Sequence, residues 1–443
     1  MLQKKNLNLS LDRRMLGKAS LASLVAMKAS TVARAQDATP VEEGATPDAG
    51  PPMDVLATGL ADPRFIAIDG DNVYFTESGT GGDEEISTTS GEVISMSGHT
   101  GKLSVLNAAD GSITEIVSDF RSYTFGDHGE IVGAAGLALD GAGGAFVAVG
   151  APGPFVGNMG LTGEEGVVYK VDLASGDKEV IADLVTWEIE QDPDPMAIDS
   201  NLYGADLLDG VLYVADAGGN TIISVDTESG EVATFAVTGG LEAPFLPEDG
   251  NPLRNGEMEI DSVPSCVVVG PDGRLYVSYV TGGPFPPGFA PVDAFSADGT
   301  EERVVEGLTM VGDLAFDSSG RMYASIISTN FLEQAPGQVV RVEGDGSLTI
   351  VADGLPVPAG IAFDGADNLY VLVFSAVAPD GGQLWRFNGA GAVADEIEEE
   401  APEDPAEGTP EEEAEAPEDP DEGTPEGTPE DEEVSDGTPD TDG

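Results

Sequence analysis

The sequence predicts an all-β fold, a six-bladed β-propeller followed by a disordered acidic C-terminal tail. Three observations predict it. A pair of short apolar strands recurs six times in the 443-residue chain. Residues typical of hairpin turns join the two strands of each pair, and no helical periodicity separates the copies. Radial repetition of four-stranded sheets is an arrangement that leaves only short, protected edges.

The six strand pairs share one pattern. The first strand alternates small and apolar residues, and an aromatic residue of the second strand follows its start by nine or ten positions. Because these aromatic residues occupy the same place in every copy, we expect them to pack between blades and not to form a stacking platform for a ligand. The first strands begin at Phe65, Gly136, Gly204, Cys266, Asp313 and Gly360, and the aromatic residues are Tyr74, Phe146, Tyr213, Tyr276, Tyr323 and Tyr370.

The outer strands of the blades follow each pair. A third alternating strand, such as residues 221–226, and a fourth edge strand, such as residues 348–351, come next. The last copy has no fourth strand after residues 384–387. Residues 54–58 precede the first copy and can supply that strand, which would close the ring. A single domain over 54–390 therefore accounts for the length better than two or three domains.

The two ends of the chain differ from the middle in charge. Residues 1–36 hold seven basic residues and one acidic residue, and they include Arg13-Arg14, which predicts a Tat-like export signal and a secreted or extracytoplasmic protein. Residues 37–53 form an acidic linker rich in Thr and Pro. In the Pro/Glu/Thr repeat tail, residues 391–443, acidic residues are dense and basic residues absent. We expect this tail to be a disordered polyanion, either purely solubilising or binding cations or cell wall.

Composition excludes several classes of function. The chain has 82 acidic and 18 basic residues and a net charge of −64, so we expect no nucleic-acid partner. Its single cysteine, Cys266, and two histidines leave no disulfide framework and no Cys/His zinc site. No apolar run reaches the length of a membrane span. We expect a monomer.

Several stretches resemble one known family. Residues 211–220 are similar to the NHL-repeat signature, and Asp62-Pro63-Arg64, Glu77-Ser78-Gly79 and the loop 281–288 resemble the ScyD/ScyE family of exported propellers, named for the scytonemin cluster. The resemblance covers nearly all of 54–390, and it departs at Leu202 and Phe65, where the family usually has Pro and Gly. It implies an NHL-like six-bladed propeller and an export route. It implies no activity, because none is established for the family as such.

Metal-dependent lactonases similar to gluconolactonase share this fold class and bind their metal in the channel. In them, carboxylates and amides just ahead of the inner strands converge on a divalent cation. The side chains at those places here are neither carboxylates nor amides, and Asp313 comes one place later. We therefore expect no metal in the channel and no cofactor, with weak calcium binding at the acidic loop 83–85 left open. The six residues just ahead of the inner-strand motifs, where the lactonases have their metal ligands, are Arg64, Ala135, Tyr203, Ser265, Gly312 and Ala359.

The sequence thus favours an exported, non-enzymatic scaffold that binds a protein, peptide or glycan partner across one face. Two alternatives stay open, a metal-dependent lactonase or hydrolase of the gluconolactonase type and an accessory factor in scytonemin-like secondary-metabolite production. No catalytic or metal-binding residue is predicted. The predicted partner-binding residues surround the channel rim or lie in the apolar loop 284–288, because such side chains combine contact area with directed hydrogen bonds. They are Arg64, Tyr203, Ser265, Asp313, Pro284 and Phe285.

Overall fold

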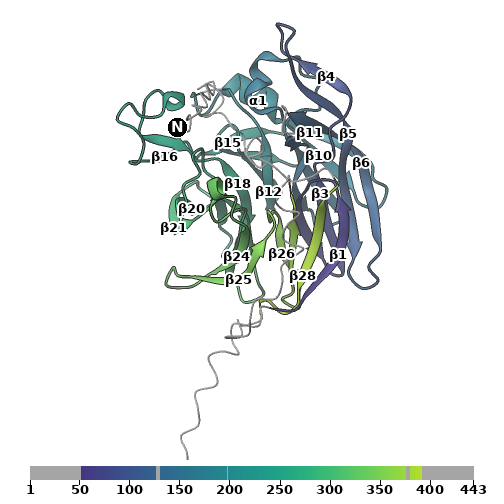
Figure 1. Cartoon of the computed structure of the whole chain (residues 1–443). Coiled ribbons are helices and arrows are strands. Elements are labelled where there is room, and N and C mark those ends of the chain that lie inside the picture. The colour runs from purple at the N-terminus through teal and green to yellow at the C-terminus, as the bar shows by residue number, and fades with distance from the viewer. Residues whose placement is uncertain (1–50, 126–129, 197, 376–379, 392–443) are drawn as a thin grey trace, which may run out of the picture. The chain divides into compact units, whose positions relative to one another are not determined.

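Six antiparallel sheets are arranged around a central channel in the computed structural model (Figure 1), which describes residues 51–125, 130–196, 198–375 and 380–391. Each sheet contains a four-stranded blade, as the repeats predicted. The export signal, most of the linker and the acidic tail lie outside the described residues, so their predictions are untested. Within the described part, no helix has the length and apolar character needed to cross a membrane.

Each blade runs from an inner strand at the channel to an outer strand at the rim. The first three blades are β2 (Pro63–Asp69), β3 (Asn72–Glu77), β5 (Val93–Asn107) and β6 (Ile113–Phe125); β8 (Ala134–Leu139), β9 (Gly144–Val149), β10 (Val167–Asp172) and β11 (Lys178–Asp183); and β12 (Leu202–Leu208), β13 (Val211–Asp216), β14 (Thr221–Asp226) and β15 (Val232–Val237). Two short strands, β4 (Glu84–Ser87) and β7 (Glu130–Val132), extend the first blade.

The remaining blades follow the same order. They are β18 (Pro264–Val269), β19 (Leu275–Tyr279), β20 (Ala290–Phe295) and β21 (Glu301–Leu308); β22 (Val311–Phe316), β23 (Met322–Ile326), β24 (Gly337–Val342) and β25 (Leu348–Leu355); and β26 (Ile361–Phe363), β27 (Leu369–Val373), β28 (Gly382–Phe387) and β1 (Met53–Leu60).

The ring closes through the N-terminal strand. β1 pairs antiparallel with β28, with Met53 opposite Phe387 and Leu60 opposite Gly382. The six inner strands contact one another in sequence, and β26 returns to β2. The predicted closure of the last blade by the segment before the first repeat is therefore confirmed.

The repeated aromatic residues are buried, as their fixed place in the repeat predicted. The ring of Tyr276 in the fourth blade lies 5.1 Å from that of Phe316 in the fifth. In the same way, the ring of Tyr323 in the fifth blade lies 4.5 Å from that of Phe363 in the sixth. These two rings thus pack on the inner strand of the following blade and help to hold neighbouring blades together.

The structure also contains a helix, although the sequence shows no helical periodicity between the repeats. Helix α1 (Leu184–Gln191) connects the second and third blades. It begins after Asp183, whose carboxylate accepts a hydrogen bond from the N–H of Thr186 at 3.0 Å, a common way to satisfy the free donors of a first turn. It ends at Asp192, which has a left-handed backbone conformation with φ of 44°.

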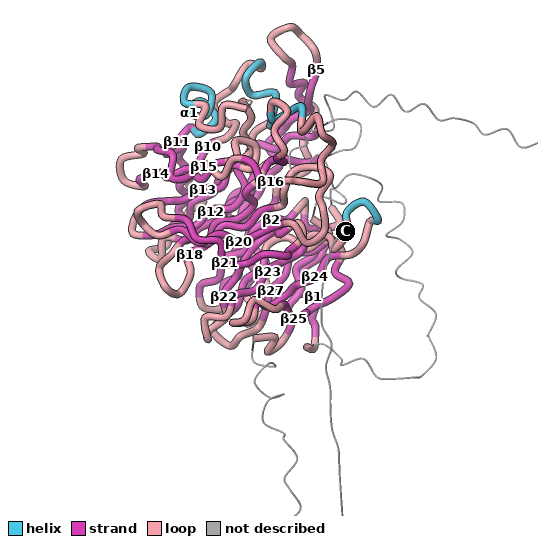
Figure 2. The backbone as a smooth tube through the Cα atoms, turned by 90° about the vertical axis from the view of Figure 1, so that its left-hand side faces the viewer, coloured by secondary structure: helices cyan, strands magenta, loops and turns pink. Residues whose placement is uncertain are grey.

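The two faces of the propeller differ in the length of their connections. On one face, no described connection between strands exceeds five residues. The opposite face, which we call the loop face, carries β4, the 3-10 helix η3 (Gly153–Asn158), α1, the hairpin β16 (Gly240–Glu242) and β17 (Glu259–Asp261) with η4 (Pro252–Arg254), and η5 (Phe331–Glu333). In Figure 1, α1 and β4 lie at the top of the domain and β16 at its upper left, and Figure 2 labels α1 and β16 after a quarter turn.

Candidate functional site

Arg64 lies in β2, the inner strand of the first blade, directly before Phe65, where the repeated motif begins. Its side chain is buried in the channel. Its guanidinium donates to Asp62 Oδ2 at 2.6 Å and to the carbonyl of Ile131 at 2.8 Å. It also donates to the hydroxyl of Tyr203 at 2.9 Å. Burial alone would lower the pKa of Arg64, but the Asp62 carboxylate and the Tyr203 hydroxyl raise it above its usual value. The cation is therefore held in the interior by a paired carboxylate and several acceptors.

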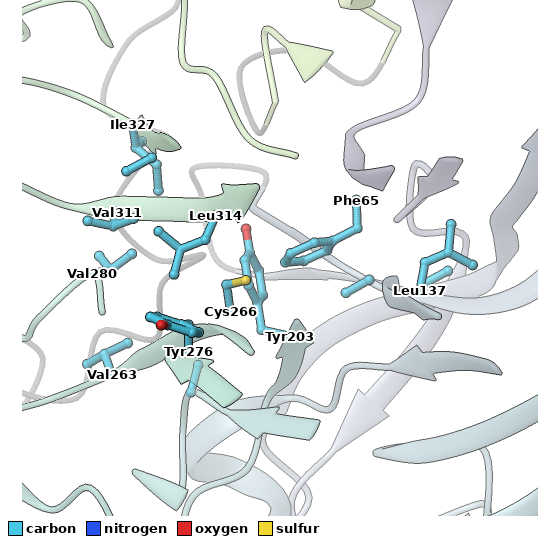
Figure 3. Close-up of a cluster of buried hydrophobic side chains, with 14 of the residues drawn as sticks. Phe65, Leu137, Tyr203, Val263, Cys266, Tyr276, Val280, Val311, Leu314 and Ile327 are labelled. Atoms are coloured by element: carbon cyan, nitrogen blue, oxygen red, sulfur yellow. The ribbon is translucent and has the colours of Figure 1, made fainter. Parts of the chain in front are cut away.

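Tyr203 occupies the equivalent place in the third blade and fills the channel beside Arg64. Its ring meets Phe65 edge to face, with 5.3 Å between centroids, and Arg64 Cζ lies 5.6 Å from the centroid of the Tyr203 ring. Figure 3 shows the ring of Tyr203 beside Phe65 and the sulfur of Cys266, among apolar residues of several blades. Burial raises the pKa of Tyr203. The hydroxyl therefore stays protonated near neutral pH.

Asp313 and Ser265 connect the fourth, fifth and sixth blades. Asp313 Oδ1 accepts a hydrogen bond from the thiol of Cys266 at 2.9 Å, and Oδ2 accepts one from the N–H of Ile361 at 2.9 Å. Ser265 Oγ donates to the carbonyl of Val311 at 2.6 Å. Burial raises the pKa of Asp313 to about 7. Both side chains thus make hydrogen bonds that cross from one blade to the next.

The same kind of bond recurs around the ring. Thr76 Oγ1 donates to the carbonyl of Ala135 at 2.6 Å, joining the first blade to the second. Ser325 Oγ donates to the carbonyl of Ala359 at 2.7 Å, joining the fifth to the sixth. Beside Arg64 and Tyr203 the channel retains a cavity of 10 Å³, about the room that one water molecule needs. In this part of the channel the polar groups serve to hold blades together.

Four of the predicted partner-binding residues are therefore buried. Arg64, Tyr203, Ser265 and Asp313 are each less than 9% exposed, although the sequence analysis placed them around an open rim. The structure brings Arg64 and Tyr203 into direct contact, whereas Ser265 and Asp313 make separate contacts between the later blades. Their role in binding a partner stays a prediction.

The other two predicted residues lie on the loop face, in the connection between β19 and β20. Pro284 is exposed, whereas Phe285 is buried and its ring lies 5.4 Å from that of Phe331 in η5. Sequence reasoning missed two neighbours. Phe245 follows β16, is 47% exposed and meets Phe289 edge to face at 5.3 Å, and Leu332 of η5 is 72% exposed.

We call these exposed and half-buried side chains the apolar ridge. Two ring contacts connect its segments, Phe245 with Phe289 and Phe285 with Phe331. The signal that could have found it is length, since 26 residues separate β15 from β18, far more than a blade-to-blade connection needs. The ridge consists of Phe245, Pro284, Pro287, Phe289 and Leu332.

The acidic loop 83–85 and the histidine that the structure describes have ordinary polar contacts. In the acidic loop 83–85, Glu84 pairs with Arg121 at 2.7 Å. His99 lies 3.1 Å from Glu164, and His128 is outside the described residues. Among the residues that the structure describes, no three His, Cys, Asp or Glu side chains are already spaced as metal ligands.

Comparisons with known proteins find weak structural likenesses only. The sequence matches no protein-family model and no curated protein. Among solved structures, it is similar to regucalcin, a calcium-binding protein from Agrobacterium tumefaciens, with 14% identity, 76% of this chain and 93% of that chain covered, and a TM-score of 0.46. A protein of unknown function from Bacteroides thetaiotaomicron is 12% identical, with 76% of this chain and 72% of that chain covered and a TM-score of 0.45. A catalytically inactive virginiamycin B lyase from Staphylococcus aureus with quinupristin is 13% identical, with 76% of this chain and 98% of that chain covered and a TM-score of 0.42. At these identities and TM-scores, the likenesses assign no activity to this chain.

Proposed function

We propose that this protein is an exported, non-enzymatic scaffold that binds a protein, peptide or glycan partner across its loop face. The observation that carries the proposal is the apolar ridge on that face, with Leu332 72% exposed and Phe245 47% exposed. The ridge stands on the face that holds the long insertions, while short turns cover the opposite face. Exposed aromatic and apolar side chains grouped on one face are typical of an interaction surface.

The channel supports binding across the surface and not within the ring. Arg64 and Tyr203 meet in it from the first and third blades, and the cavity beside them has a volume of 10 Å³. The lactonase alternative needs carboxylate oxygens that face a bound cation. The carboxylate of Asp313 instead accepts hydrogen bonds from Cys266 and Ile361, so its oxygens contribute to contacts between blades.

The charge of the chain defines the partner further. With 82 acidic and 18 basic residues, the domain repels polyanions and favours a neutral or basic partner. A peptide or protein with basic and apolar side chains suits the ridge, and so does a neutral glycan that stacks on the exposed ring of Phe245. We also propose membership of the ScyD/ScyE family, Tat export and a monomeric state, on the motifs and the leader described above. The accessory role in secondary-metabolite production remains the alternative that the family resemblance suggests.

The test uses the full chain and three substitutions of apolar residues by serine. Phe245→Ser and Leu332→Ser remove the ridge, whereas Ile350→Ser removes an equally apolar side chain that is 56% exposed on the outer strand β25. Binding is measured against glycan arrays and by crosslinking to the secreted protein fraction. We expect one ligand to be retained by the wild type and Ile350→Ser and lost by both ridge variants.

Two outcomes would contradict the proposal. The first is a ligand that all three variants bind as the wild type does, because the ridge would then not be the contact. The second is turnover of a lactone or ester that chelation abolishes, which would favour the lactonase alternative.

A further inference from the structure

Glu188 of helix α1 is a buried carboxylate that accepts no hydrogen bond from the part of the chain that the structure describes. The residue is 0% exposed, and neither Oε1 nor Oε2 makes a hydrogen bond within the described residues. Burying an ionised carboxylate in this way is costly unless a cation or a proton neutralises it. The side chain therefore calls for a partner that the described residues do not supply.

The groups that act most strongly on Glu188 are themselves carboxylates. They are Asp216, Asp192, Asp199 and Asp194. Two of the four each accept several hydrogen bonds from neighbouring groups. Asp216 accepts from the N–H groups of Asn201, Gly218 and Gly219 and from Ser200 Oγ. Asp194 accepts from Arg254 at 3.2 Å and from Asn220 at 3.1 Å.

The remaining carboxylates approach one turn of the chain. A Cβ built on Gly219 would lie 3.2 Å from Glu188 Oε1, and one on Gly218 would lie 2.5 Å from Asp199 Oδ1. Two successive glycines thus let the carboxylates of Glu188 and Asp199 come close to the same backbone. Asp192, which ends α1, is half-buried, and its Oδ1 has no hydrogen-bond partner in the described part.

We propose that Glu188, Asp192 and Asp199 bind a calcium ion between α1 and the 216–220 turn of the third blade. The donors are all oxygens on an irregular loop, which suits the flexible coordination of Ca²⁺ by six to eight oxygens. Backbone carbonyls and water would complete the shell. The three carboxylates are not yet at ligand spacing, so the ion would draw them together. Half-buried Asp192 and Asp199 leave a route from solvent.

Protonation of Glu188 is the competing way to neutralise it. Burial, with the nearby Asp216, raises the pKa of Glu188 to about 9, so the carboxyl holds a proton at neutral pH when no cation is bound. Calcium binding would release that proton to solvent and leave the carboxylate as a ligand. This site shares no residue with the channel groups described above, the acidic loop 83–85 or the acidic tail. It also lies beyond the proposed partner binding, although it would fix α1 on the same face (Figure 1).

The experiment uses terbium as a luminescent substitute for calcium in the full chain. Trp187 precedes Glu188 in α1 and can transfer excitation energy to a lanthanide bound there. We expect tryptophan-sensitised emission that calcium displaces with a dissociation constant of about 10⁻⁴ to 10⁻³ M, the range of extracellular calcium modules. Trp187→Phe should abolish the emission and leave the calcium-induced rise in melting temperature intact.

Glu188→Gln keeps the shape of the side chain and removes its charge, and Glu190→Gln is the matched control on the exposed side of the same helix. We expect Glu188→Gln to weaken calcium binding about tenfold or more, and to melt higher than the wild type without calcium. Glu190→Gln should behave as the wild type. Because the acidic tail is present in every variant, any cation that it binds contributes equally to all of them and cancels in the comparison.

A second variant, Asp192→Asn, keeps the test decisive if Glu188→Gln does not fold, since it should also weaken calcium binding. The proposal is overturned if calcium raises the melting temperature of the wild type and Glu188→Gln equally. It is also overturned if calcium has no effect on the wild type while Glu188→Gln melts higher, because Glu188 would then hold a proton only.

Discussion

The hydroxyl of Tyr203 in β12 lies 2.9 Å from Nη1 of Arg64 in β2, so a single hydrogen bond joins the inner strands of the third and first blades across the channel. The second blade, β8, stands between these two strands in the ring. Contacts across a propeller channel are therefore present here in addition to those between adjacent blades. Losing the Tyr203 hydroxyl would leave one N–H of a buried guanidinium without its acceptor.

Tyr203→Phe should lower the free energy of unfolding by about 1–3 kcal/mol, because a buried donor loses its partner. Urea denaturation of the full chain measures the change. Tyr213→Phe, in the same blade, is the control, since its hydroxyl takes no part in the Arg64 contacts. Equal effects of the two substitutions would show that the bond across the channel contributes nothing particular.

The contribution of Asp313 to stability should fall as pH rises. Burial raises its pKa to about 7, so between about pH 4 and pH 7 the folded protein holds a proton that the unfolded chain releases. In that window the stability of the wild type relative to Asp313→Asn should decrease by about 4 kcal/mol at most, and above pH 7 the difference should be constant. Denaturation curves at several pH values measure it. A relative stability that rises with pH would contradict the assignment.

Asp317 should show the opposite sign. Burial favours its neutral form, but hydrogen bonds from Arg321 and Tyr323 outweigh burial and lower its pKa. Its contribution should be present above the unfolded pKa of about 4 and be lost as pH falls below it. The same curves for Asp317→Asn would test this, and a loss of its contribution above pH 5 would be inconsistent with the lowered pKa.

Tyr323→Ala should destabilise the domain by roughly 3–5 kcal/mol, the usual cost of truncating a buried aromatic side chain. The residue is 0% exposed, packs on Phe363, and donates to Asp317 at 3.0 Å. Ile350→Ala, on an exposed position of β25, should change stability by no more than about 0.5 kcal/mol. Thermal and chemical denaturation of both variants give the comparison. Similar melting of the two would refute packing between blades.

Replacing Arg13 and Arg14 by Lys should trap the precursor inside the cell if the leader uses the Tat route. Immunoblots of the cell and culture fractions follow the precursor. Unchanged secretion of the Lys-Lys form would leave the general secretory route or no export.

The blades could be predicted because their signals are local. The alternation of Phe65 to Ile68, the turn pair Gly70-Asp71 and the aromatic Tyr74 lie within ten residues, and each of these features favours an antiparallel hairpin without knowledge of the rest. The closing strand was predicted from what the last repeat lacked. Ring closure, although it joins residues more than 300 positions apart, thus followed from counting strands.

The channel and the loop face were harder to predict because their contacts are not local. Nothing near Arg64 in sequence shows that it meets Tyr203, 139 positions away, so its side chain was placed at an open rim and not in the interior. Helix α1 did have signals, Asp183 as a cap and Pro193 just after its end, but eight residues give little periodicity. Glu188 is charged, and only the fold reveals that it is buried.

The register of β1 on β28 determines how the ring responds to force. Met53 faces Phe387, so the segments that lead to both ends of the chain leave the strand pair at the same end. Tension between the two ends would therefore load the hydrogen bonds one at a time, in an unzipping geometry, because these bonds run perpendicular to antiparallel strands. If both ends were held, the sixth blade would peel open from Met53 toward Leu60 while the other five kept their pairing. The domain is thus suited to attachment through one of its termini, and not to resisting tension applied between them.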